Sequence, residues 1–290
     1  MLRAHWLFLL LGLLPLSAHA APITLEMRPN LSATADYQSG APDKPAILIL
    51  HGFLQTREFA TVAMLARGLA DAGYSVLTPT LTLGIPGRKQ SLACEAVHHT
   101  SLVDDIAEID RWVKWLRGKG HRDIVLMGHS FGSLQLLAYL QNQPNPAVTG
   151  FVGVSMVEAQ IGGQPRAPLI ERLTAQVAQH DRKLVTEPLS FCGKYPTTAE
   201  ALLTYVRWDQ PRLLAALHRL GDRSLLIMGG SDNRLERGWL QALQHLKTPL
   251  IVIDGGNHFM DGEHEFDVLE HTLAFLQSGI PSEPSHTQPK

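Results

Sequence analysis

Most of the chain alternates short apolar runs with longer amphipathic segments. The apolar runs lie at Ala46–Leu50, Tyr74–Thr78, Ile124–Met127, Thr149–Ser155, Ser224–Met228 and Pro249–Ile253. Runs of this length between helical segments are typical of strands buried on both faces of a parallel sheet. The pattern predicts an α/β fold, a mostly parallel sheet with helices on both faces.

Helical periodicity is clearest from Val103 to Leu116, where apolar residues recur every three or four positions. Asp104 and Asp105 fall in the first turn and Gly118 follows the last, so we interpret the two aspartates as a helix-start signature. The same criteria predict further helices at Glu58–Ala72, Leu134–Leu140, Leu235–Leu246 and Glu265–Leu276.

One interval, Val157–Asp222, breaks this alternation. Its pattern predicts no strand, only helical segments at Leu169–His180, Ala199–Arg207 and Pro211–Leu220. We expect a helical insertion over the sheet, within a single domain that spans residues 21–290. The polar, proline-containing segment at about 278–290 is predicted to be disordered.

The N-terminus has the layout of a secretory signal peptide. Arg3 precedes an apolar run from Trp6 to Leu16, and Ala18-His19-Ala20 is a small-x-small ending, which predicts cleavage between Ala20 and Ala21. The alternative is a retained anchor, but the run is shorter than a membrane span and contains Pro15. We therefore expect an exported protein, periplasmic or secreted, with no stable membrane anchor after cleavage.

Composition adds two constraints. Hydrophobic residues make up 45% and charged residues 18% of the 290 residues, which is globular, and the net charge of −2 comes without a basic stripe that would suit nucleic acid. The only cysteines are Cys94 and Cys192, too far apart in sequence for a CxxC motif. An oxidising compartment allows them to pair in a disulfide; two separate buried thiols are the alternative.

The sharpest chemical signal is Gly128-x-Ser130-x-Gly132. It follows an apolar strand and opens a helix, the setting in which a serine on a tight turn is exposed as a nucleophile. Such a serine needs a base, and the base needs an orienting acid. His258 and Asp232 each lie just past a predicted strand, at the same sheet edge as Ser130, and Glu158 is the competing acid.

The remaining candidates concern the developing oxyanion. Backbone N–H groups of Phe53 and Phe131 are expected to stabilise it, with His51 as a hydrogen-bonded scaffold residue and Gly52 allowing the turn. His98-His99 resembles a metal pair, yet no third ligand lies at a suitable spacing, so no metal site and no cofactor are predicted.

The chain resembles the α/β-hydrolase superfamily over about Lys44 to Leu276. The residues that carry the resemblance are His51-Gly52-Phe53, Gly128-His129-Ser130-Phe131-Gly132, Asp232 and His258. The resemblance implies the order nucleophile, acid, histidine, and an insertion at residues 157–222 that acts as a lid. Two departures stand out: the lipase-type HGGG is absent, and about two dozen residues before the first core strand leave one or two antiparallel edge strands short or missing.

The expected function is that of an exported serine hydrolase that cleaves small to medium carboxylic esters through an acyl-enzyme. Its partner is a small-molecule ester. A peptidase of the same superfamily and a catalytically silent binding module are the alternatives. The sequence specifies neither the acyl and alcohol groups nor the oligomeric state.

Overall fold

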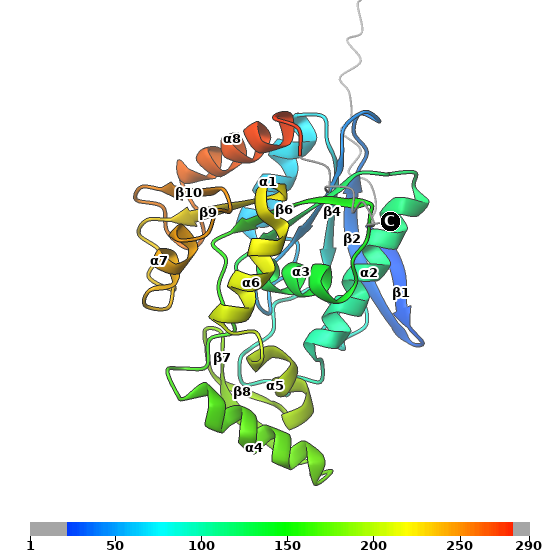
Figure 1. Ribbon diagram of the computed structural model, residues 1–290. Helices are drawn as coiled ribbons and strands as arrows, with labels where there is room; N and C mark the ends of the chain where they lie inside the picture. Colours follow the sequence, from blue (N-terminus) through cyan, green and yellow to red (C-terminus); the bar gives the residue numbers. More distant parts are fainter. Residues whose placement is uncertain (1–21, 281–290) are drawn as a thin grey trace, which may run out of the picture.

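The computed structural model describes residues 22–280 and contains one eight-stranded sheet (Figure 1). The strands follow the order β1-β2-β4-β3-β5-β6-β9-β10, and pairing is antiparallel only between β1 and β2 and between β2 and β4. They are β1 (Ile23–Arg28), β2 (Leu31–Gln38), β3 (Ala46–Leu50), β4 (Ser75–Thr80), β5 (Ile124–His129), β6 (Val148–Val154), β9 (Ser224–Gly229) and β10 (Leu250–Ile253). The predicted mostly parallel α/β sheet is confirmed.

Helices cover both faces of this sheet, as the fully apolar strands require. Along β3 the side chains alternate: Ile47 and Ile49 join one hydrophobic cluster, and Leu48 and Leu50 join the other. The first cluster includes residues of α1 (Ala60–Asp71) and α8 (His264–Gln277). The second is covered by α2 (Leu102–Gly118), α3 (Phe131–Asn142), α6 (Gln210–Leu220) and α7 (Trp239–Gln244).

The N-terminal hairpin corrects one expectation. The edge strands are neither short nor missing: β1 has six residues and β2 has eight. They fit because the turn between them needs only Pro29 and Asn30, and Asn30 has φ 65°, a conformation that asparagine tolerates better than most residues. In β2 the burial alternates along the strand, as on a sheet with one face toward the core.

The insertion corrects a second expectation. Besides α4 (Arg166–Ala178) and α5 (Ala199–Val206), it holds a separate two-stranded antiparallel sheet of β7 (Leu184–Leu189) and β8 (Cys192–Thr198). In Figure 1 these four elements gather at one end of the molecule, apart from the main sheet. The predicted all-helical insertion is therefore wrong in its middle part, where the hairpin turns at Ser190 with φ 54°.

Other boundaries shift by a few residues. The predicted helix Leu235–Leu246 is reduced to α7, which starts after Gly238 in a left-handed conformation (φ 83°). A short 3₁₀ turn, η1 (Gly221–Arg223), leads into β9. The predicted signal peptide and most of the predicted disordered tail lie outside the described residues. Among residues 22–280, no helix is long and apolar enough to cross a membrane.

The two cysteines are joined. Cys94 and Cys192 form a disulfide with a sulfur–sulfur distance of 1.99 Å. The bond connects the loop before α2 to the start of β8, and an isolated bridge between His98 and Thr197 lies beside it. The β7–β8 hairpin is thus attached covalently to the body of the molecule.

Candidate active site

Ser130 lies on a tight turn between β5 and α3. Its backbone has φ 55° and ψ −126°, a conformation that costs a residue with a side chain about 1–3 kcal/mol. The flanking glycines allow this turn by close approach: a Cβ on Gly128 would lie 2.5 Å from the backbone of Ser133, and one on Gly132 would lie 2.4 Å from the carbonyl oxygen of His51. The turn therefore requires glycine at both positions.

The structure brings Ser130, His258 and Asp232 together in one chain of hydrogen bonds. Ser130 Oγ lies 2.8 Å from His258 Nε2, and His258 Nδ1 lies 2.8 Å from Asp232 Oδ2. If Nδ1–H donates to the carboxylate, Nε2 is left to accept the Ser130 hydroxyl proton. These side chains come from the loops after β5, β10 and β9, at one edge of the sheet.

Asp232 has the surroundings of an orienting acid. Its side chain is fully buried, and its second carboxylate oxygen accepts a hydrogen bond from the Arg234 N–H at 2.9 Å. The competitor, Glu158, instead forms an ion pair with Arg166 at 3.4 Å and accepts a hydrogen bond from Gln210. Geometry thus favours Asp232 over Glu158.

The two backbone N–H groups predicted to stabilise the oxyanion belong to residues near this serine. Phe131 is the first residue of α3, so its N–H has no partner within the helix. A Cβ on Gly52 would lie 3.4 Å from Ser130 Cβ, which places the turn containing Phe53 beside the hydroxyl. That these two N–H groups hold a negatively charged oxygen next to Ser130 stays a prediction.

His51 fixes that turn, the scaffold role expected of it. Its Nδ1 donates to the Gly52 carbonyl oxygen at 2.9 Å, and its Nε2 accepts the Leu81 N–H at 3.1 Å. Burial and, to a smaller extent, the charge of Arg88 lower the pKa of His51 to about 3. A neutral ring is required, because only then can one nitrogen donate while the other accepts.

The loop that carries His258 is held by two residues that sequence reasoning missed. His129 Nε2 donates to the carbonyl oxygen of His258 at 2.9 Å, and Thr61 Oγ1 donates to that of Phe259 at 2.7 Å. Burial lowers the pKa of His129 to about 4, so this ring also stays neutral near pH 7. His129 lies inside the glycine–serine motif, and that position was the only available signal.

Aromatic rings surround the serine. Phe53 contacts Phe131, Phe191 and Tyr195, with ring centroids 4.7, 5.7 and 5.4 Å apart. Phe191 and Tyr195 belong to the β7–β8 hairpin, and Phe131 also contacts Tyr205 of α5, at 5.9 Å. Ser130 is only 8% exposed beneath them. The inserted hairpin and α5 therefore form one wall of the site.

Asp105 lies in the first turn of α2, as the sequence predicted, and has a second role behind this wall. Only Asp104 caps α2, through Ser101. Asp105 is 1% exposed, and its Oδ2 accepts hydrogen bonds from Gln135 Nε2 and Tyr205 Oη, each at 2.7 Å. The carboxyl group thus connects α2 to both α3 and α5.

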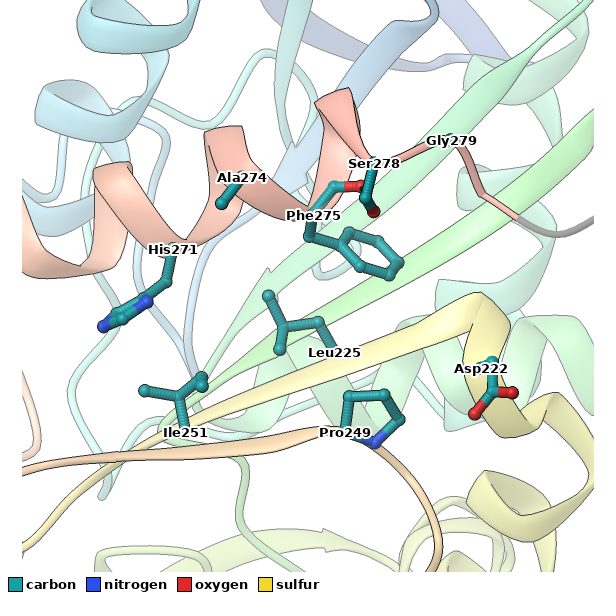
Figure 2. Close-up of a pocket in the computed structure, with 9 residues that line it drawn as sticks. All are labelled: Asp222, Leu225, Pro249, Ile251, His271, Ala274, Phe275, Ser278 and Gly279. Carbon is teal, nitrogen blue, oxygen red and sulfur yellow. The ribbon is translucent and has the colours of Figure 1, made fainter.

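The His98-His99 pair and a cavity at the far edge of the sheet lie outside the hydrogen-bonded chain of Ser130, His258 and Asp232. Within residues 22–280 no group of three or more His, Cys, Asp or Glu side chains could hold a metal ion, and His98 stacks on Tyr195 at 4.1 Å. A cavity of about 400 Å³ lies between α8 and the starts of β9 and β10, at the opposite edge of the sheet (Figure 2). It is lined mostly by apolar groups such as Leu225, Ile251 and Phe275.

A parallel sheet with a strained serine, a histidine and an acid at its carboxyl-terminal edge defines the α/β-hydrolase fold. The chain belongs to the Alpha/beta hydrolase family, whose model matches residues 47–270. The expected superfamily is therefore confirmed. No curated protein sequence matches the chain.

Three solved structures illustrate the likeness. The alpha/beta hydrolase GrgF from Penicillium sp. sh18 is 14% identical, with 90% of this chain and 98% of that chain covered and a TM-score of 0.66. Est1E from Butyrivibrio proteoclasticus is 14% identical, with coverages of 90% and 100% and a TM-score of 0.60. The Paleococcus ferrophilus monoacylglycerol lipase is 18% identical, with coverages of 85% and 98% and a TM-score of 0.60. At these identities the likeness establishes the fold alone.

Proposed function

We propose that this protein is a serine hydrolase that cleaves small to medium carboxylic esters through an acyl-enzyme. The observation that carries the proposal is the hydrogen-bonded chain from Ser130 through His258 to Asp232 on the strained turn. A serine hydroxyl becomes an effective nucleophile when a base accepts its proton, and the base works when an acid fixes its orientation.

The reaction follows from this geometry. Ser130 Oγ attacks the ester carbonyl carbon while its proton passes to His258 Nε2, and the Asp232 carboxylate stabilises the resulting imidazolium. The N–H groups of Phe53 and Phe131 hold the oxyanion. The tetrahedral intermediate collapses, the C–O bond to the alcohol breaks, and His258 protonates the leaving oxygen. Water then repeats the attack and releases the acid and free Ser130.

The size of the acyl group is proposed from the wall of the site. Phe191, Tyr195 and Tyr205 provide apolar surface from the insertion, and we propose that the insertion acts as a lid over Ser130. An aromatic pocket suits an uncharged acyl chain better than a peptide with charged ends. Because the insertion holds only two helices and a hairpin before α6, a compact pocket is favoured over a deep tunnel.

A fluorophosphonate probe tests the reaction class. It should label the wild-type protein at Ser130, and Ser130→Ala should lose both labelling and ester hydrolysis while its circular dichroism spectrum is unchanged. A folded wild-type protein that the probe does not label would favour the silent binding module instead.

Ester and amide substrates distinguish the proposed esterase from a peptidase. In a p-nitrophenyl ester series, turnover should be fastest for short and medium chains and should fall for long ones. Aminoacyl amides should be poor substrates. Faster turnover of the amides than of the esters would replace the esterase proposal with a peptidase.

The cellular location is also a proposal. We propose that the protein is exported after cleavage between Ala20 and Ala21, and the disulfide between Cys94 and Cys192 supports an oxidising compartment. N-terminal sequencing of the protein recovered from a producing cell's periplasm or medium would test this. An uncleaved N-terminus in the cytoplasm would contradict it.

A further inference from the structure

Arg234 lies beside the proposed active site, two residues after Asp232. Its guanidinium carbon lies 4.7 Å from the ring centroid of Phe259 and 5.8 Å from that of Phe191. Phe259 follows His258 in the chain, and Phe191 contacts Phe53. One aromatic ring therefore separates this cation from the proposed base, and another separates it from the proposed oxyanion hole.

The charge of Arg234 is not neutralised by the protein. Within residues 22–280, its guanidinium forms no ion pair and donates no hydrogen bond; its contacts are the two rings. The nearest acids in the chain are Asp232 and Glu236. Asp232 has its two carboxylate oxygens bonded to His258 Nδ1 and to the backbone N–H of Arg234, and among the described residues Glu236 forms no ion pair with Arg234. The side chain is exposed, so a ligand can reach it.

The backbone of Arg234 is held on both sides. Its N–H donates to Asp232, and its carbonyl oxygen accepts a hydrogen bond from Gln160 Nε2 at 2.6 Å. Gln160 follows β6 at the start of the insertion. With the backbone fixed and the guanidinium carbon over the Phe259 ring, the group is placed before any ligand binds, which lowers the entropy cost of binding.

We propose that Arg234 binds a carboxylate on the leaving-alcohol part of the ester, an inference that rests on the function proposed above. The side of the site follows from the chemistry. His258 protonates the leaving oxygen, so the alcohol lies toward His258 and its neighbour Phe259, where Arg234 is stacked. The acyl chain lies against the aromatic wall instead.

Carboxylate recognition fits the properties of a stacked guanidinium. Contact with an aromatic ring uses none of the N–H donors of a guanidinium, and these donors match the two oxygens of a carboxylate. A guanidinium is also weakly hydrated, so that ligand binding removes water at a small cost.

A pair of acetyl esters that differ in charge tests the proposal: 4-acetoxybenzoate, whose leaving group carries a carboxylate, and neutral 4-acetoxybenzamide. The quantity measured is the ratio of kcat/KM for the benzoate to kcat/KM for the benzamide. Arg234→Gln should lower this ratio by about fivefold or more, and Arg234→Lys should lower it less, because charge remains without the planar fork. The wild-type ratio should also fall as ionic strength rises.

Arg212→Gln is the matched control. Arg212 is also exposed and also stacks on an aromatic ring, with its guanidinium carbon 4.2 Å from Trp208, but it contacts neither Phe191 nor Phe259. This variant should leave the ratio unchanged. An Arg234→Gln ratio equal to that of wild type would overturn the proposal. So would an effect seen only when the carboxylate is placed on the acyl chain, as in mono-4-nitrophenyl succinate compared with 4-nitrophenyl butyrate.

A binding measurement separates this inference from the proposed reaction. On a Ser130→Ala background, calorimetric titration with 4-hydroxybenzoate and 4-hydroxybenzamide requires no turnover. Arg234→Gln should weaken binding of the benzoate about fivefold relative to the benzamide. If wild type hydrolyses neither acetyl ester yet this binding difference is present, the proposed function fails and the anion site stands. If Arg234→Gln leaves the ratio of benzoate affinity to benzamide affinity unchanged on the Ser130→Ala background, the anion site is ruled out, whatever the activity.

Discussion

Ser130 needs its side chain for the proposed attack, yet its backbone has a conformation that is favourable only for glycine. The φ of 55° and ψ of −126° belong to a region that a residue with a Cβ rarely occupies. The protein therefore retains local strain of about 1–3 kcal/mol at the proposed nucleophile.

Replacing the serine should reveal this strain. Ser130→Gly should unfold at a higher urea concentration than Ser130→Ala, with a free energy of unfolding about 1 kcal/mol higher. Glycine removes the strain but loses more conformational entropy on folding, which offsets part of the gain. Both variants should be inactive. Equal stability of the two would show that the strain is no larger than the conformational entropy that glycine loses on folding.

Asp232 can be tested by a change that keeps its shape. Asp232→Asn should lower kcat about 10⁴-fold, because an amide favours the wrong histidine tautomer. The matched change is Glu158→Gln, which alters an ion pair with Arg166 outside the hydrogen-bonded chain and should lower kcat far less. A larger loss in Glu158→Gln than in Asp232→Asn would reassign the acid.

At the scale of elements, the disulfide connects two segments 98 residues apart in the chain. Replacing both cysteines, as in Cys94→Ser with Cys192→Ser, should lower the free energy of unfolding by about 4–5 kcal/mol if the chain-entropy model holds. Chemical denaturation with and without reductant measures this difference. If the reduced and oxidised proteins unfold at the same midpoint, the bond contributes no net stability.

The elements that the sequence predicts well are those whose own residues are apolar or periodic enough to identify them, without knowledge of the segment that they pair with. Buried strands such as Ala46–Leu50 are apolar throughout. Ser130 follows β5 directly, and Asp232 and His258 lie three and five residues after the ends of β9 and β10. Parallel strands all end at one edge, so their positions in the sequence were enough to bring Ser130, Asp232 and His258 to the same side.

The missed elements depend on their partners. Strand β7 reads LVTEPL and β8 reads CGKYPTT, and each contains a proline that weakens a strand signal. They form because they pair with each other and pack on the body. The contacts of Arg234, His129 and Asp105 were also beyond sequence reasoning, since each depends on residues distant in the chain.

At the scale of the whole molecule, Asp105 should make stability depend on pH. Burial raises its pKa to about 7, although hydrogen bonds from Gln135 and Tyr205 oppose the rise. An unfolded aspartic acid has a pKa near ~4. Between these values the folded protein holds a proton on Asp105 that the unfolded chain has lost, so the contribution of Asp105 to stability falls as the pH rises from about 4 to about 7.

Asp105→Asn should remove this contribution. The change in unfolding free energy from pH 4 to pH 7, measured by urea denaturation, should be more positive in the variant than in wild type by on the order of 3 kcal/mol. Both proteins retain Glu108, whose pKa burial also raises and which adds a slope in the same direction, and His51 and His129, whose lowered pKa values add a slope in the opposite direction. These contributions cancel in the comparison of the two proteins. Parallel curves for the two proteins would show that Asp105 does not titrate in this range.

The insertion leaves the sheet after β6 and returns at β9, and these two strands are neighbours. None of the groups that the proposed chemistry uses comes from the inserted segment; they follow β3, β5, β9 and β10. Mutations that change the hairpin can therefore accumulate without altering the register of the sheet or the activation of Ser130. Under the proposed function, selection for a new acyl group and selection for rate act on different parts of the gene, which makes the insertion the natural target for directed evolution of acyl specificity.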